Sequence, residues 1–201
     1  LIQNVRHSDW HCFVPRVESR WGIDVNEDRD AYWKSVSKNT RKKIKRYSRK
    51  LQDADVIRVT EVEQIPDFVR DVLRVAERSW KTRENGRFVD EQELTGRLTH
   101  LASNGMLRAW LMVWNGQPIA FDITVGVNGY MEGMECAYDE ELSDLSPGMV
   151  LLSRSIDDLF EMNDVDFYDF GHGDMSYKAR LSTDCRSSYH AILMPPGIRS
   201  T

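Results

Sequence analysis

The sequence contains few cysteines and no long apolar run. The three cysteines, Cys12, Cys136 and Cys185, are odd in number and far apart, so they form neither a disulfide framework nor a CxxC metal pair. No apolar run approaches the roughly 18 to 20 residues that a membrane-spanning helix needs, and the N-terminus lacks the apolar core of a signal peptide. These absences predict a protein without a membrane span that works in a reducing compartment, the cytoplasm.

Several catalytic signatures are also missing from the sequence. It has no HExxH pair, no Walker A loop and no GxSxG nucleophile elbow. His7 and His11 are four residues apart, but no third ligand is indicated near them, so we expect no metal site. Cys136 falls within a predicted core strand. A cysteine in such a position is more often a buried, unreactive thiol than a nucleophile.

What the chain does contain is enough apolar material for a sizeable core. It has 201 residues, of which 41% are hydrophobic and 10% aromatic. We expect an extended N-terminal segment over residues 1–30 and a single domain over residues 31–201. Because the chain begins at Leu1 instead of Met, it is expected to be processed or a fragment, such as the C-terminal half of a longer tandem protein.

The charge is distributed unevenly along the chain. The net charge is −5, yet eight of the 27 basic residues lie between Lys38 and Lys50, a segment with no acid. A solvated helix face would explain this segment, and so would a surface that binds the phosphates of a nucleic acid, with Tyr47 available for stacking.

Apolar periodicity predicts three helical regions and a strand between residue 28 and residue 103, the first of them including this basic segment. One helix begins near Asp28 or Asp30 and continues or restarts into the basic residues. A strand over residues 55–62 is followed by a helix from Pro66 to about Lys81. Asp90 is a candidate N-cap for a further helix that ends near residue 103.

The middle of the chain predicts an antiparallel meander. Strands over residues 106–114, 118–127 and 130–138 are separated by two Asn-Gly pairs, the strongest short signal for a β-hairpin. A helix opens at Ser146-Pro147-Gly148, and strands follow over residues 165–170 and 187–194. This order predicts an α+β fold with one mixed, mostly antiparallel central sheet flanked by helices.

The segment from Asp166 to Lys178 combines a short aromatic strand with two glycines and several polar side chains. Gly171 and Gly173 permit backbone conformations, or a close approach of a ligand, that a side chain would block. A strand that ends in such a loop is typical of a functional site, although an ordinary turn would show the same pattern.

Three motifs in order resemble CelD-type and Fem-type acyltransferases of the GNAT superfamily. They are Lys38-Asn39-Thr40-Arg41-Lys42-Lys43-Ile44-Lys45-Arg46, Ser146-Pro147-Gly148-Met149-Val150-Leu151-Leu152, and Tyr168-Asp169-Phe170-Gly171-His172-Gly173-Asp174 with Tyr177-Lys178. The resemblance implies a GNAT-like fold and an N-acyltransferase that moves an acyl group from a thioester to an amine. It implies no permanently bound cofactor, with acyl-CoA as the donor co-substrate.

The donor is expected to lie against the end of the meander and the start of the next helix. A helix start presents free N–H groups and a positive dipole, which suits a pyrophosphate. The expected donor contacts are Ala137, Tyr138, Ser146, Pro147, Gly148 and Met149. This loop lacks the Arg or Gln of most GNAT enzymes and contains Asp144, so coenzyme A, an acyl carrier and aminoacyl-tRNA all stay open as donors.

Acyl transfer needs a base for the attacking amine and an acid for the leaving thiolate. Glu132 and Glu135 on the third strand and Asp122 on the second are candidate bases. Strand alternation places the two glutamates on opposite faces, and we favour Glu135. Tyr177 is the expected proton donor, and Asp174 a further catalytic candidate.

The acceptor, a small molecule or a peptide with an amine, is expected to contact Trp80, Arg83, Arg87, Tyr168 and Lys178. A guanidinium suits an acceptor carboxylate or phosphate. Two alternatives use the basic helix over residues 38–50: a Fem-type transferase that takes its acyl group from aminoacyl-tRNA, and a non-catalytic nucleic-acid-binding domain.

Overall fold

The computed structural model describes residues 11–26, 28–81, 90–162, 164–173 and 175–194. Its strands are β1 (His11–Asp24), β2 (Asp55–Val59), β3 (Leu107–Trp114), β4 (Gln117–Val127), β5 (Gly129–Tyr138), β6 (Val165–Asp169) and β7 (Asp184–Met194). Its α-helices are α2 (Arg29–Ser35), α3 (Lys38–Lys50), α4 (Ile65–Glu77), α6 (Glu91–Ser103), α7 (Pro147–Glu161) and α8 (Ser176–Leu181). Two 3₁₀ helices, η1 (Val62–Gln64) and η2 (Glu140–Leu145), complete the described elements.

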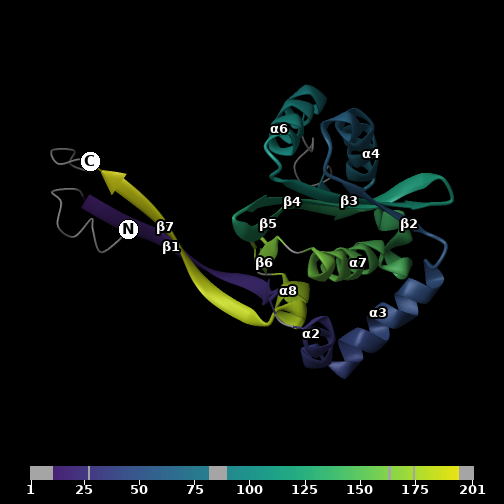
Figure 1. The fold of residues 1–201 in the computed structure, drawn as a ribbon, viewed down its shortest axis with the longest axis horizontal. Coiled ribbons are helices and arrows are strands. Elements are labelled where there is room, and N and C mark those ends of the chain that lie inside the picture. Colours follow the sequence, from purple (N-terminus) through teal and green to yellow (C-terminus); the bar gives the residue numbers. More distant parts are fainter. Residues whose placement is uncertain (1–10, 27, 82–89, 163, 174, 195–201) are drawn as a thin grey trace.

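The strands form one mixed sheet in the order β2-β3-β4-β5-β6-β1-β7. Only the β5–β6 pair is parallel; the other neighbouring strands are antiparallel. Helices α4 and α6 cover one face, and α7, with α3 and α2 beyond it, covers the other (Figure 1). The predicted α+β fold with a mostly antiparallel sheet is confirmed.

The backbone geometry of its two Asn-Gly turns determines the antiparallel form of the meander. Asn115 and Gly116 have φ of 52° and 73°, and Asn128 and Gly129 have φ of 50° and 80°. Two successive residues with positive φ are what a type I′ hairpin turn requires, and Asn-Gly meets this requirement with little strain. The three predicted strands are therefore confirmed as β3, β4 and β5.

The helices agree with the sequence prediction except at some ends. The expected first helix is interrupted, because Ser37 caps α3 by accepting a hydrogen bond from the Thr40 N–H, so α2 and α3 are separate. Helix α4 ends at Glu77 instead of near Lys81. Asp90 caps α6 as predicted, accepting from the N–H groups of the second and third helical residues. Helix α8 was not predicted.

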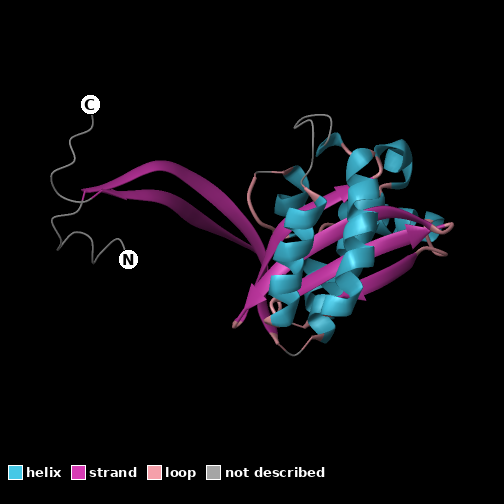
Figure 2. Ribbon diagram, turned by 90° about the horizontal axis from the view of Figure 1, so that it is seen from above, coloured by secondary structure: helices cyan, strands magenta, loops and turns pink. Residues whose placement is uncertain are grey.

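Strands β1 and β7 pair into a long two-stranded ribbon that extends away from the body of the protein (Figures 1 and 2). Within the N-terminal segment over residues 1–30, which was expected to be extended, β1 is one long strand from His11 to Asp24. Its last residues, from Gly22 to Asp24, pair with β6, so the ribbon is anchored beside the parallel pair. This pairing brings the N-terminal segment next to the expected site.

The sheet has an apolar core on each face. The core beneath α7 includes Trp110, Met112, Met131 and Tyr168, and the core beneath α4 and α6 includes Phe121 and Ile123. Within the described residues, no helix has the length and hydrophobicity needed to cross a membrane.

Candidate active site

Strands β5 and β6 separate at the end of their parallel pairing. The ladder runs from Gly129↔Val165 to Glu132↔Asp169, where β6 ends, while β5 continues to Tyr138. Beyond Glu132, β5 has one paired neighbour among the described strands, β4. The last part of β5 therefore has an edge that is not paired to a strand.

Two glycines mark the point of separation. Gly171 has a φ of 75°, and a Cβ built on it would lie 2.1 Å from the carbonyl oxygen of Gly133. A side chain there would clash with a backbone atom, which cannot move away as a flexible side chain can. The glycine expected to permit a close approach does so, but the approaching group is the chain itself, at the base of the separation.

The α7 face of β4 and β5 near the separation carries acidic groups whose pKa values are all raised. Asp122 and Cys136 are cross-strand partners on the face toward α7. Asp122 is 6% exposed and accepts one hydrogen bond of 3.4 Å from the Ser155 hydroxyl of α7. Burial raises the pKa of this carboxyl from 3.8 to about 7.

Cys136 lies beside Tyr177 of α8. The Cys136 side chain reaches solvent, but protein groups surround it on its other sides. This desolvation, with the nearby Asp122, raises the pKa of the thiol to about 11. Burial likewise raises the pKa of Tyr177, and proximity to Cys136 and Asp122 adds to the effect. The thiol and the phenol are thus proton donors near neutral pH, and Cys136 is not set up as a thiolate nucleophile.

The other face of β5, toward α4, carries carboxylates with cationic partners. Glu135 forms an ion pair with Lys81, which also lies 5.6 Å from the centre of the Trp80 ring. Trp80 and Lys81 both follow the end of α4 in the sequence. The predicted acceptor residue Trp80 and the predicted base Glu135 are therefore brought together through Lys81.

Glu132 lies on this same face, which differs from the expected alternation. A register shift between Ile123 and Thr124 of β4 leaves Met134 as an extra residue in β5. Such a bulge changes the alternation of side chains along a strand. Consequently Glu132 and Glu135 both face the α4 side, and the prediction that they occupy opposite faces is wrong.

Glu132 belongs to an ionic network with the ribbon. Arg20 of β1 donates to Glu132 at 2.6 Å and to Asp169 at 2.9 Å, and the Tyr130 hydroxyl donates to Asp169. Burial opposes the charge of Arg20, but these hydrogen bonds and charges outweigh it and raise its pKa. Burial and the Asp169 interaction raise the pKa of Tyr130 to about 12. Because the sequence does not reveal which strand pairs with β1, it did not indicate this network.

The start of α7 presents fewer free amides than expected. Ser146 has a φ of 49°, Pro147 has no N–H, and the N–H groups of Met149 and Val150 both donate to the Ser146 carbonyl. Among the described N–H groups of the first turn, the Gly148 N–H is therefore the one left to bind a ligand. A Cβ on Gly148 would lie 2.9 Å from the Tyr138 ring, so packing of α7 against the end of β5 accounts for this glycine.

A pocket of about 470 Å³ lies beside this helix start. It is formed by α3, α7 and α8, and the expected donor residues Ser146 and Met149 line it together with Lys43 and Arg180. The basic helix therefore adjoins the predicted donor site. The sequence does not reveal that Lys43 and Arg180 are neighbours of Ser146, because both are distant from it along the chain.

Two predicted substrate residues are buried. Tyr168 is 2% exposed and packs edge-to-face on Phe170, with ring centres 5.0 Å apart. Lys178 is 3% exposed and donates to the carbonyl oxygens of Gly171 and His172, so it holds the loop that follows β6. Arg83, Arg87 and Asp174 lie outside the described residues. Ala137 is buried in the core beneath α4 and α6.

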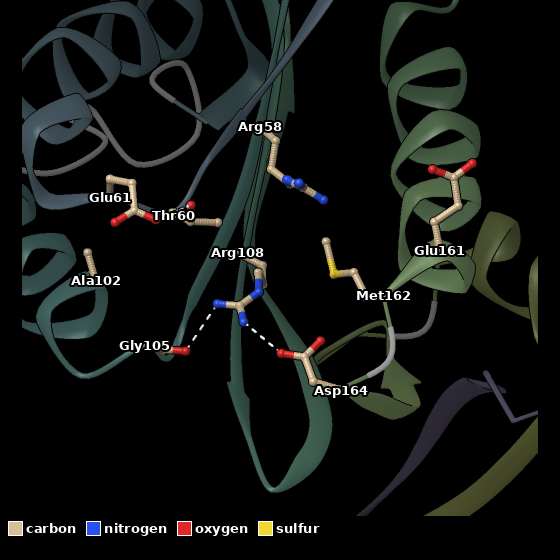
Figure 3. A pocket seen from close by; sticks show the side chains of 9 residues that line it. All are labelled: Arg58, Thr60, Glu61, Ala102, Gly105, Arg108, Glu161, Met162 and Asp164. Carbon is tan, nitrogen blue, oxygen red and sulfur yellow. Dashed lines mark hydrogen bonds and ion pairs between the residues drawn. The ribbon is translucent and has the colours of Figure 1, made fainter.

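A second pocket, of about 510 Å³, lies at the opposite end of the sheet (Figure 3). Its two arginines are neutralised by nearby acids. Arg108 pairs with Asp164 at 2.8 Å, and Arg58 pairs with Asp158 at 3.1 Å. None of the predicted site residues lines it.

The sheet with a parallel pair that separates, followed by a helix start, has the architecture expected of an acyltransferase. A family model described as "Acetyltransferase (GNAT) domain" matches residues 38–179, most of the chain. The chain therefore belongs to the GNAT acetyltransferase family, a family of acyltransferases. A search of curated proteins finds no match to the sequence.

Solved structures of similar fold have low sequence identity. A C-terminal DUF2156 domain from Agrobacterium fabrum has a TM-score of 0.68 at 14% identity, over 95% of this chain and 64% of that one. FemX has a TM-score of 0.67 at 10% identity, over 93% and 65%. The structure of L-PGS from Bacillus licheniformis has a TM-score of 0.63 at 10% identity, over 99% and 65%. The chain thus spans less than two thirds of the length of these structures.

Proposed function

We propose that the protein transfers an acyl group from acyl-CoA, or another acyl thioester, to an amine, with the donor in the separation between β5 and β6. The observation that carries this proposal is the placement of proton donors and carboxylates around one unpaired strand end. Tyr177 and Cys136 lie on the α7 face of β5, and Glu135 with Lys81 lies on the α4 face. The amide groups of a pantetheine arm can pair with the free edge of a strand as a neighbouring strand would.

The reaction proceeds by direct attack. The amine nitrogen attacks the thioester carbonyl carbon from the α4 side, and Glu135 accepts the proton that the nitrogen loses. The C–S bond then breaks, and the Tyr177 hydroxyl donates a proton to the departing sulfur. An acid and a base of this kind each contribute about 10²- to 10⁴-fold to a rate.

Asp122 has a positioning role in this proposal. It has no ion-pair partner among the described residues, and its ionised form, which is populated as the pH rises through about 7, raises the pKa values of Cys136 and Tyr177. By disfavouring ionisation of the phenol, it keeps the Tyr177 proton available for the leaving thiolate.

A specific observation also favours a second donor class, aminoacyl-tRNA. Most cationic side chains of α3 are exposed to solvent, and such a surface can neutralise RNA phosphates. The acceptor in either case is a small-molecule or peptide amine.

The test of the proposed function is a survey of donors by mass spectrometry. The protein is incubated with acyl-CoA, acyl carrier protein or aminoacyl-tRNA and a panel of amines, and acylated products are identified. We expect acylated amine and free CoA, both lost in Tyr177→Phe with Glu135→Gln. Transfer from aminoacyl-tRNA alone would select the second candidate, and no transfer from any donor would contradict acyl transfer.

A further inference from the structure

The proposed base Glu135 already holds an amine that belongs to the chain itself. The Lys81 ammonium donates a hydrogen bond to the Glu135 carboxylate, and the two side chains form an ion pair on the α4 face of β5. An acceptor of an acyl group must place its amine at the same carboxylate, because a general base has to be within hydrogen-bond reach of the proton that it removes. Lys81 therefore occupies the position that the acceptor amine needs.

The surroundings of the Lys81 ammonium are those of a cation-binding site. Glu135 provides a negative charge, and the centre of the Trp80 ring lies 5.6 Å from the ammonium nitrogen. A carboxylate and the face of an aromatic ring both attract an alkylammonium. An external primary amine would make the same two contacts, so it and Lys81 compete for one place.

Lys81 is also near the place where the donor sulfur is proposed to bind. Burial is the main cause of the raised pKa of the Cys136 thiol, and the positive charge of Lys81 opposes that rise. Cys136 directly follows Glu135 in β5, in the part of this strand that β6 no longer pairs. A thioester bound in the separation therefore has an amine, a base and the Tyr177 acid close to its carbonyl carbon.

Two other lysines provide comparisons. Lys178 is 3% exposed and donates to the backbone carbonyl oxygens of Gly171 and His172, which accept hydrogen bonds but do not take up a proton near neutral pH. Lys34 of α2 is exposed to solvent. Exposure favours uncatalysed acylation of Lys34, since the side chain of Lys81 is only 13% exposed. Faster acylation of Lys81 would thus require the site.

We propose that Lys81 is acylated by the protein's own acyl donor, and that this modification switches off transfer to external amines. The assignment rests on the proposed function and adds a self-modification site beside its catalytic base. The amide on Lys81 carries no charge, so it ends the ion pair with Glu135. The acylated side chain then fills the acceptor position between Glu135 and the Trp80 ring.

The reaction uses the groups already assigned to acyl transfer. The Lys81 ammonium gives one proton to Glu135, whose side chain is 31% exposed and passes the proton to water. The neutral nitrogen forms a bond to the thioester carbonyl carbon and loses its second proton to Glu135, while the C–S bond breaks and the sulfur takes a proton from Tyr177. The proton on Glu135 restores that of Tyr177 through water. The products are an amide on Lys81, a free thiol and one released proton.

The test is peptide mass spectrometry of the full chain during incubation with acetyl-CoA or octanoyl-CoA. Acylation is followed at Lys81, Lys178 and Lys34 in the wild type, Glu135→Gln, Lys81→Arg and the matched control Lys34→Arg. Arginine at position 81 keeps the positive charge but is not acylated, because a guanidinium stays protonated. Transfer to the amines of the donor survey is measured after increasing times of incubation, and thermal unfolding verifies that each variant is folded.

We expect acylation of Lys81 to be at least roughly 10-fold faster than that of Lys34 or Lys178 and to saturate with acyl-CoA, because a positioned base acts on Lys81 alone. Glu135→Gln should slow acylation of Lys81 by about 100-fold and leave that of Lys34 unchanged. An external amine in excess should protect Lys81. Transfer to that amine should decline in step with acylation of Lys81 in the wild type and in Lys34→Arg, whereas in Lys81→Arg it should not decline with time.

Four results would overturn the assignment. Acylation of Lys81 no faster than that of Lys34, with transfer to external amines intact, would reject Lys81 as an acceptor and retain the proposed function. Acylation of Lys81 that is as fast in Glu135→Gln would be uncatalysed. Acylation of Lys81 without a decline in transfer would reject the switch. Acylation of neither Lys81 nor any external amine would count against the proposed function as well.

Discussion

Acidic groups on the two faces of the sheet, near the separation of β5 from β6, have different surroundings. On the α7 face, Asp122 is buried against a serine hydroxyl, and its pKa is raised to about 7. On the α4 face, Glu135 pairs with Lys81, and Glu132 with Arg20. The same strand pair thus places acidic groups with raised pKa values on one side and charge-paired carboxylates on the other. The difference comes from the packed neighbours, since α7 offers a hydroxyl where the end of α4 and the ribbon offer cations.

The largest effect is expected from Glu135→Gln. Loss of the base on the α4 face should reduce kcat by about 10³-fold, within the usual range for a general base. Glu132→Gln is the control on the same strand and face, and its kcat should stay within 10-fold of the wild type. Steady-state kinetics with the acceptor identified in the donor survey measure both. Equal losses in the two variants would mean that the two glutamates do not differ in role.

A substitution at Gly171 tests the close approach between the chain after β6 and Gly133 of β5, at the base of the separation. Gly171→Ala combines a φ of 75° with a Cβ 2.1 Å from the Gly133 oxygen, so it should lower the free energy of unfolding by about 3 kcal/mol. Gly173→Ala has a φ of 91° but no atom within 4 Å of its Cβ, so it should cost only about 1–2 kcal/mol. Urea unfolding measures both, and the same cost in the two variants would refute the close approach.

Tyr177→Phe tests the α7 face. Loss of its proton donor should lower kcat by about 10²-fold with little change in KM. The loss should be smaller for donors whose leaving thiol is more acidic, because a better leaving group needs less protonation. Tyr189→Phe, at an exposed tyrosine of β7, is the control and should have full activity. A Tyr177→Phe variant with wild-type kcat for every donor would exclude the tyrosine as the acid.

The smallest effect concerns the pH dependence of stability. The Asp122 carboxyl has a pKa of about 7 when folded and an ordinary value of 3.8. Between these values the folded protein retains a proton that the unfolded chain has lost, so this group's contribution to stability falls as the pH rises toward 7 and is constant above it. Asp122→Asn should reduce the change in unfolding free energy between pH 5 and pH 8 by about 2 kcal/mol. Chemical denaturation at several pH values measures this, and an unchanged slope would contradict a raised pKa of the buried Asp122 carboxyl.

Much of the fold could be predicted from residues that are close together in the sequence. The site was harder to predict, because it depends on contacts between residues that are far apart in the sequence. The Asn-Gly turns at residues 115–116 and 128–129 specify the meander because their backbone geometry is set within four residues. The bulge at Met134 has no comparable signal, so the face of Glu132 was predicted wrongly. The partners Lys81 and Arg20 come from the end of α4 and from β1, whose places beside β5 depend on packing across the whole chain.

The most direct test of the account uses Cys136 as a probe within the separation. Cys136 and Cys185 are both exposed free thiols, but only Cys136 lies beside Tyr177, where the donor sulfur is proposed to bind. Alkylation by iodoacetamide, followed by mass spectrometry at each cysteine with and without saturating acyl-CoA, compares the two in one molecule. We expect acyl-CoA to slow alkylation of Cys136 by roughly 10-fold or more, as when at least nine tenths of the sites are occupied, and to leave alkylation of Cys185 unchanged. Equal alkylation of Cys136 with and without bound acyl-CoA would contradict a donor between β5 and β6.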